Sequence, residues 1–151
     1  MLEKLLSPDR IVLDLKSKTK EEVLQELLKP LNLPPEQEKV VLAALKKREA
    51  IGSTGIGKGI AIPHTRSLVL DKVNLVIGRS KKGIDFDALD KKPVHLFFLL
   101  VAPPQDPGTV YLLTLGKIAH VARKLSGKKD YLEIDDPEKF MEYILKLEEE
   151  E

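Results

Sequence analysis

The sequence predicts one α/β domain spanning residues 1–151, in which helices pack on a mixed β-sheet. Three observations lead to this fold class. Strand-like and helix-like segments follow one another in the order strand, two helices, three strands, two helices. Residues 94–101 are almost wholly apolar, which is typical of a strand covered on both faces. The 151 residues, 42% of them hydrophobic, supply enough apolar material for one core, and no long linker divides them.

The first part of the chain is predicted to hold one strand and two helices. Residues 9–15 contain a short β-branched run, which favours a strand. Thr19 then stands three residues before Glu22, the spacing of a capping box at the start of a helix. That helix ends at Pro30, which cannot continue it. A second helix is predicted over residues 35–49, because its apolar residues recur at helical spacing.

The rest of the chain is predicted to hold three strands and two further helices. These are strands at 60–62, 73–78 and 94–101, a helix at 109–124 and a last helix from about residue 136. A proline-rich loop containing Pro107 and Gly108 joins the third of these strands to the helix that follows it.

Composition excludes several classes of function. The chain has no cysteine, which removes disulfides, thiolate-bound zinc and thiol nucleophiles. No apolar run reaches the roughly 18 residues that a membrane span needs, and the first residues do not resemble a signal peptide. With a net charge of +1, nothing drives the whole chain toward nucleic acid or a membrane surface. These features favour a cytoplasmic protein.

A glycine-rich loop occupies residues 52–59, which hold four of the nine glycines of the chain. Such a loop can present successive backbone N–H groups to an anion, although a tight connection without any ligand has the same composition. The run from Gly52 to Lys58 matches the opening of a nucleotide-binding P-loop. However, Gly59 replaces the required Ser or Thr, and the loop leads from helix to strand rather than from strand to helix.

His64 is the strongest candidate for chemistry, because it follows this loop and the conformationally restricted Pro63. A neutral imidazole is a nucleophile near pH 7, since its ordinary pKa is about 6.5. A histidine at the end of a strand beside an anion-binding loop therefore predicts a group-transfer site. Taken alone, an isolated loop histidine is more often structural.

The residues from Arg48 to His64, Arg-Glu-x-x-Gly-Ser-Thr-Gly-Ile-Gly-x-Gly-Ile-Ala-Ile-Pro-His, resemble the active-site signature of EIIA domains of the fructose/mannitol class. These domains belong to the bacterial phosphoenolpyruvate-dependent sugar phosphotransferase system, and their nitrogen-regulatory relatives share the signature. The resemblance continues through residues 86–103 and from Tyr111 into the following helix. It implies a three-layer α/β/α sandwich. It also implies that His64 accepts phosphate from an HPr-like phosphocarrier and passes it to an EIIB domain.

The expected phosphate contacts come from the motif itself. Backbone amides of Gly57, Lys58 and Gly59, with the hydroxyl of Ser53 or Thr54, are expected to donate to the phosphoryl oxygens. Arg48 is expected to add a positive charge, as the resemblance also implies, although a cation at the end of a helix has a structural use. Arg66 is a further candidate, with a solvated side chain as the alternative. The transfer requires no metal and no cofactor.

Tyr111 marks a departure from the resembled family, many of whose sugar-specific members carry a second histidine at the matching position. Its hydroxyl can hydrogen-bond phosphate or imidazole, but its ordinary pKa near 10 prevents acid-base chemistry at neutral pH. His95 and His120 are interpreted as structural or surface residues.

Two functions remain open at this point. In the first, the domain passes phosphate to EIIB for sugar uptake and meets the membrane only through a transporter. In the second, it is a stand-alone module whose His64 phosphorylation state controls a regulatory target protein. An unrelated ligand-binding α/β domain would require the long His64 motif to be a coincidence.

Overall fold

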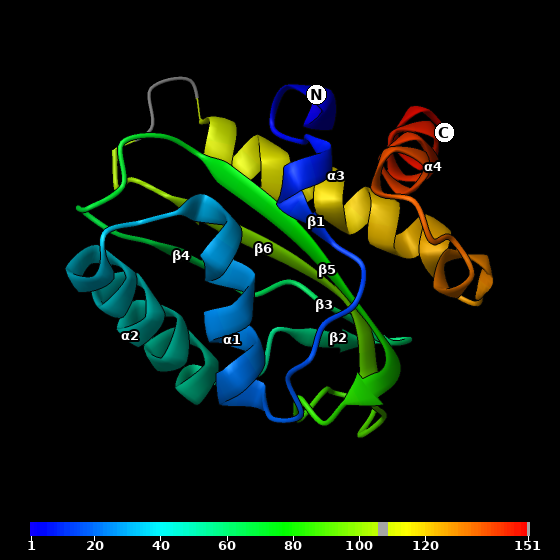
Figure 1. Ribbon diagram of the computed structural model, residues 1–151, viewed down its shortest axis with the longest axis horizontal. Coiled ribbons are helices and arrows are strands. Elements are labelled where there is room, and N and C mark those ends of the chain that lie inside the picture. The colour runs from blue at the N-terminus through cyan, green and yellow to red at the C-terminus, as the bar shows by residue number, and fades with distance from the viewer. Residues whose placement is uncertain (106–108, 151) are drawn as a thin grey trace.

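A mixed β-sheet forms the middle layer of the molecule (Figure 1). The computed structural model describes residues 1–105 and 109–150, so the predicted loop residues Pro107 and Gly108 lie outside the described part. Within that part the sheet has six strands in the order β1-β5-β6-β3-β2, with β4 also paired to β6. The strands are β1 (Ile11–Val12), β2 (Gly55–Gly57), β3 (Ile60–Ala61), β4 (His64–Arg66), β5 (Asn74–Ile84) and β6 (Val94–Ala102).

Two helices cover each face of the sheet, which confirms the α/β class and the three-layer arrangement (Figure 1). One face carries α1 (Lys20–Leu28) and α2 (Pro35–Ile51), and the other carries α3 (Val110–Leu125) and α4 (Pro137–Glu149). None of the helices in residues 1–105 and 109–150 is long and apolar enough to cross a bilayer.

The central strand β6 separates the two hydrophobic cores, as its apolar sequence predicts. Side chains alternate between the faces of a strand. Leu96, Phe98 and Leu100 accordingly pack under α3 and α4, while Phe97 and Leu99 pack under α1 and α2. All five are fully buried. The strand is antiparallel to β5 and parallel to β3 and β4, so it also fixes where those shorter strands lie.

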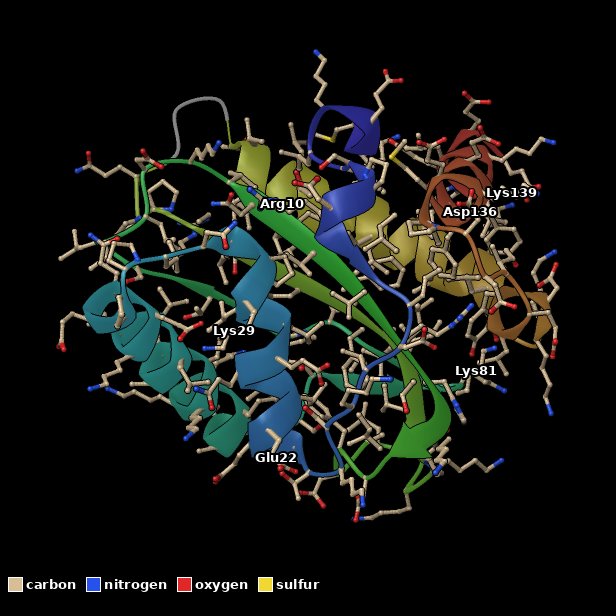
Figure 2. The ribbon with its side chains drawn as sticks, in the orientation of Figure 1. Arg10, Glu22, Lys29, Lys81, Asp136 and Lys139 are labelled. Atoms are coloured by element: carbon tan, nitrogen blue, oxygen red, sulfur yellow. The ribbon has the colours of Figure 1, made fainter. Side chains whose placement is uncertain are left out.

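The helix boundaries follow the capping residues expected from the sequence. Thr19 accepts a hydrogen bond from the Glu22 amide, and the Glu22 carboxylate accepts one from the Thr19 amide, which completes the capping box of α1. Figure 2 shows Glu22 at this end of α1 and Lys29 at the other. Asp136 caps α4 by accepting from the Lys139 amide at 3.0 Å, and both residues lie at its first turn (Figure 2).

Two strands differ in length from the prediction, because backbone pairing rather than the hydrophobic pattern sets their ends. The first strand covers only two of the expected residues 9–15, because Pro8–Arg10 forms a 3₁₀ turn before it. The strand predicted at 73–78 runs on to Ile84, past the end of its apolar run. Its pairing with β6 shifts register between Arg79 and Ile84, and this irregularity is invisible in the hydrophobic pattern.

Pro63 divides what the sequence suggested was a single strand followed by a loop. β3 ends at Ala61, and a new strand, β4, begins at His64 beside the same neighbour, β6. Proline has no N–H to donate, but its carbonyl still accepts from the Leu100 amide at 3.0 Å. The chain therefore stays against the sheet through the proline, and His64 is held on a strand rather than in a free loop.

Candidate functional site

His64 is the first residue of β4 and is partly exposed. Its backbone pairs with Leu100, near the carboxyl end of the central strand β6. The helix α2 packs against β4, and α3 begins shortly after β6 ends. Pairing of β4 with β6 restrains the His64 backbone, while the ring stays partly exposed.

The imidazole is oriented by a backbone carbonyl. Its Nδ1 lies 2.7 Å from the carbonyl oxygen of Ile62. Because a carbonyl oxygen only accepts hydrogen bonds, Nδ1 must carry the proton. The neutral ring therefore has its lone pair on Nε2. The Ile62 backbone is itself fixed, since its amide donates to the Thr54 carbonyl at 3.0 Å.

Tyr111 lies in the first turn of α3, beside His64. The centroids of the two rings are 6.4 Å apart and their planes are tilted by 54°. Only 5% of Tyr111 is exposed, and burial raises the pKa of its phenol above the usual value, against the opposing charges of Arg66 and Arg48. The hydroxyl therefore stays protonated near neutral pH. Tyr111 can donate a hydrogen bond there but cannot serve as a base.

Arg66 stacks on the ring of Tyr111. Its guanidinium carbon lies 4.3 Å from the centroid of the Tyr111 ring, a cation–π contact. Its Nη1 also donates to the Pro104 carbonyl at 3.3 Å. Arg66 is two residues after His64 on β4, so both side chains leave the same face of the strand. The side chain is exposed to solvent, as in the structural alternative, and these two contacts also hold it beside Tyr111.

Arg48 occupies the last turn of α2, where it makes the structural contact expected of a cation at a helix end. Its Nη1 donates to the Gly52 carbonyl at 2.8 Å, so it satisfies a carbonyl at the end of the helix. Its charge also acts on the Tyr111 phenol. The charges of Arg48 and Arg66 therefore both act on Tyr111, whose ring lies beside that of His64.

The hydroxyls of Ser53 and Thr54 bind protein groups, and the Thr54 carbonyl accepts from Ile62, two residues before His64. The Ser53 hydroxyl donates to the Phe86 carbonyl at 2.9 Å and accepts from the Gly55 amide at 3.0 Å. The buried Thr54 donates its hydroxyl to the carboxylate of Glu49, which also accepts from the Thr54 amide. Both residues shape the loop, and neither hydroxyl is directed at the His64 ring by these contacts.

Glu49 is a structural residue of this loop that the sequence reasoning missed. It is 7% exposed, and its carboxylate also pairs with the Lys20 ammonium at 3.1 Å. A buried carboxylate needs such partners, because removing it from water is costly. The signal was present in the sequence, since Glu49 directly follows Arg48 in the motif, but motif position alone does not show burial.

Replacing Thr54 with valine will destabilise the protein without touching His64. The change keeps the side-chain shape but removes a hydroxyl that donates to the buried Glu49 carboxylate. We expect a loss of about 1–3 kcal/mol in the free energy of unfolding, measured by urea denaturation. Thr65→Val is the matched control, because the Thr65 hydroxyl makes only an exposed contact at 3.5 Å, and it should change stability far less. Equal effects of the two changes would contradict this role for Thr54.

The structure does not bring the turn Gly57–Gly59 to His64, contrary to the expectation of a phosphate-binding loop there. The Gly59 carbonyl bonds to the Leu96 amide, whereas His64 pairs with Leu100 four residues further along β6, roughly 13 Å away. The Lys58 amide already donates to the Asp90 carboxylate at 3.0 Å. The turn therefore binds the Asp90 carboxylate, and it lies toward the opposite end of β6 from the partner of His64.

The backbone conformation of this turn accounts for its glycines. Gly57, Lys58 and Gly59 all have positive φ, at 95°, 60° and 82°. Glycine adopts this conformation without strain. The glycine-rich composition thus reflects a tight turn between β2 and β3, which was the ligand-free alternative.

The other two histidines lie outside this site. His95 is on β6, partly buried, with Nδ1 at 2.9 Å from the Ser80 carbonyl. His120 is on α3, and its Nε2 lies 2.6 Å from the Glu150 carbonyl. Within residues 1–105 and 109–150, no three histidine or carboxylate side chains gather as metal ligands would.

Comparison with known proteins places this geometry in context. The model of the family described as "Phosphoenolpyruvate-dependent sugar phosphotransferase system, EIIA 2" matches residues 4–147. A nitrogen regulatory protein of Bradyrhizobium diazoefficiens is 37% identical over 133 residues, 83% of this chain and 86% of that protein. The fructose-specific EIIABC component of Bacillus subtilis is 30% identical over 145 residues, 95% of this chain but only 23% of that longer protein.

Solved structures show the same fold. The nitrogen regulatory protein IIA-Ntr of Neisseria meningitidis superposes with a TM-score of 0.79 at 30% identity, covering 95% of this chain and 98% of that one. The mannitol IIA of Escherichia coli, in complex with its phosphorylated IIB, superposes with a TM-score of 0.66 at 18% identity, covering 93% and 97%.

Proposed function

Because the chain belongs to the EIIA 2 family of the phosphoenolpyruvate-dependent sugar phosphotransferase system, we propose that Nε2 of His64 accepts and carries a phosphoryl group. The observation that supports this most strongly is the contact between Nδ1 and the Ile62 carbonyl, because it leaves Nε2 as the nucleophile. Members of the family include both sugar-specific components and nitrogen regulatory proteins, and the phosphoryl carrier is the chemistry that serves either role.

The proposed step is an in-line phosphoryl transfer from an HPr-like phosphocarrier. The Nε2 lone pair attacks phosphorus, a new Nε2–P bond forms, and the bond from phosphorus to the donor breaks. The ring becomes positively charged while Nδ1 keeps its proton. The Ile62 carbonyl, already 2.7 Å from Nδ1, stabilises that charge without rearrangement.

The charged neighbours of His64 are suited to the phosphoryl oxygens. Arg66 is held by the Tyr111 ring and the Pro104 carbonyl, and its guanidinium can offer a bidentate pair of donors. Arg48 adds a second positive charge from the end of α2. Tyr111 contributes a protonated hydroxyl and the surface on which Arg66 stacks.

The proposal is tested by incubating the protein with phosphorylated HPr. We expect one phosphate per chain, stable to base and labile to acid, as for a phosphoramidate. The amount bound should be read by intact mass and by acid hydrolysis. No uptake, or an acid-stable phosphate, would rule out a phosphohistidine.

Removing Arg66 is expected to slow phosphate uptake. Arg66→Ala deletes a charge-assisted donor next to His64, which corresponds to a rate loss of about 10- to 100-fold. Arg66→Lys keeps the charge but loses the planar stack on Tyr111. Its rate of phosphate uptake should therefore lie between those of wild type and Arg66→Ala. Lys72→Ala is the control, as an exposed cation outside the site. Uptake by Arg66→Ala at the wild-type rate would show that Arg66 does not act on the phosphate.

The destination of the phosphate has two candidates. In the first, His64 passes it to the cysteine of an EIIB domain for sugar uptake, and the mannitol IIA was itself solved in complex with its IIB. In the second, the phosphorylation state of His64 controls a regulatory target protein. The second is favoured by the near full-length match to a nitrogen regulatory protein and by Tyr111 at the place of a second histidine.

A transfer assay separates the two. The phosphorylated protein is mixed with the EIIB domain of a fructose-class transporter, and phosphate on each partner is followed over time. Rapid loss from His64 to the EIIB cysteine supports the transport role. Retention on His64 supports the regulatory role. In either case we propose a cytoplasmic protein whose residues 1–151 act as one domain, with no nucleic-acid partner and membrane contact only through a transporter.

A further inference from the structure

A pocket lies at the opposite end of the sheet from His64. It surrounds His95, whose position on β6 is five residues before Leu100, the partner of His64. That separation is roughly 17 Å along the strand. The pocket has a volume of about 570 Å³, within the range of sites for small molecules. It shares no residue with the His64 site and plays no part in the proposed phosphoryl transfer.

Positive charge gathers around this pocket from three separate chain segments. Lys58 comes from the β2–β3 turn, Lys92 from the segment before β6, and Lys128 and Lys129 from the segment after α3. Among the described residues, none of these four lysines forms an ion pair with a carboxylate. The whole chain carries a net charge of only +1, so this cluster is a local excess.

The single acid in the pocket is already engaged. Asp90 accepts from the Lys58 amide at 3.0 Å and from the Lys92 amide at 3.1 Å. The Lys58 amide, and then the Lys92 amide, lower the pKa of this carboxyl below its usual value. Asp90 therefore organises the two backbone segments that bring Lys58 and Lys92 to the rim, and its hydrogen bonds are made with amides rather than with the lysine side chains.

The floor of the pocket combines hydrogen-bonding groups with apolar surface. His95 keeps its Nδ1 at the Ser80 carbonyl, which leaves Nε2 as the free ring nitrogen. Tyr131 is 4% exposed, and its hydroxyl lies 3.5 Å from where a Cβ on Gly59 would sit. A glycine at position 59 thus leaves the space next to the hydroxyl open. Pro93 and Leu132 supply an apolar wall.

We propose that this lysine pocket, formed around His95 by Lys58, Lys92, Lys128 and Lys129, binds a small organic phosphate ester. The phosphoryl group would meet the lysines, and the organic part would lie against Pro93, Tyr131 and Leu132. Phosphate is favoured because lysines from three chain segments line one opening, while the lining carboxylate, Asp90, accepts from two backbone amides. The proposal does not depend on phosphorylation of His64.

Calorimetric titration with glucose 6-phosphate tests this assignment on the intact protein. We expect saturable binding that is weakened at least about tenfold in the double variant Lys128→Glu/Lys129→Glu. The matched control is Lys46→Glu/Lys47→Glu, an adjacent exposed pair on α2 with the same charge change, which should bind within twofold of wild type. His64→Gln should also bind like wild type, because its site is remote. All variants are checked for folding by circular dichroism.

Two further ligands examine the chemical class. Inorganic phosphate and glucose should each bind more weakly than glucose 6-phosphate. Phosphate alone would contact only the lysines, and glucose alone would contact only the apolar wall. The proposal is overturned if wild type does not bind, if both lysine pairs lower affinity equally, if His64→Gln abolishes binding, or if inorganic phosphate binds as tightly as the ester.

Discussion

Replacing His64 with glutamine will abolish phosphorylation by HPr while leaving the fold intact. The glutamine amide can still donate to the Ile62 carbonyl, as Nδ1 does in wild type, but it has no nucleophilic nitrogen. Loss of an essential nucleophile typically removes at least about 10³-fold of the rate. We therefore expect no detectable phosphate on the variant, measured by intact mass after incubation with phosphorylated HPr, together with unchanged circular dichroism.

The other two histidines provide matched controls. His95→Gln and His120→Gln replace the same side chain at positions on β6 and α3 whose ring contacts are with other backbone carbonyls. Both variants should take up one phosphate at close to the wild-type rate. If His64→Gln still accepted phosphate, or if one of the other changes abolished uptake, His64 would not be the acceptor.

Replacing Arg79 with methionine will have the largest effect on stability. Arg79 is 1% exposed, and its guanidinium donates to the carbonyls of Leu13, Tyr131 and Ile134. These contacts tie β5 to the segment after β1 and to the connection between α3 and α4. Methionine fills the volume but leaves three carbonyls without their donor. We expect a loss of about 3–5 kcal/mol in the free energy of unfolding, measured by urea denaturation.

Lys81 offers the comparison for the Arg79 result. It pairs with Asp135 at 3.1 Å, and Arg79 approaches the same carboxylate at 3.6 Å, but Lys81 is exposed (Figure 2). Lys81→Met should therefore cost at most about 1 kcal/mol. A similar small effect for Arg79→Met would show that the buried guanidinium does not hold these segments together.

The parts of the fold that sequence predicts well are those fixed by local physics. Thr19 and Glu22 cap α1 through contacts three residues apart, so the helix start can be read directly from their spacing. The apolar run of β6 requires cover on both faces, and this places the strand at the centre of the sheet. His64 could be singled out because its motif is contiguous in sequence.

The parts that sequence could not predict depend on contacts between distant segments. The strands β2 and β4 are three residues long and are defined by their neighbours β3 and β6, not by any pattern of their own. The turn around Lys58 resembled a phosphate cradle, yet its amide is bound by Asp90, 32 residues later. Burial of Glu49 likewise depends on Lys20. Each error arose where a local motif had a partner elsewhere in the chain.

The central claim is that phosphate forms on Nε2 of His64, and nuclear magnetic resonance of the ¹⁵N-labelled, phosphorylated protein tests it most directly. A phosphorus–nitrogen correlation spectrum identifies which ring nitrogen bears the phosphoryl group, and the His64→Gln variant assigns the residue. The contact between Nδ1 and the Ile62 carbonyl predicts a single phosphoryl group coupled to Nε2, with Nδ1 still protonated. A phosphoryl group on Nδ1 of His64, or on any other residue, would contradict it.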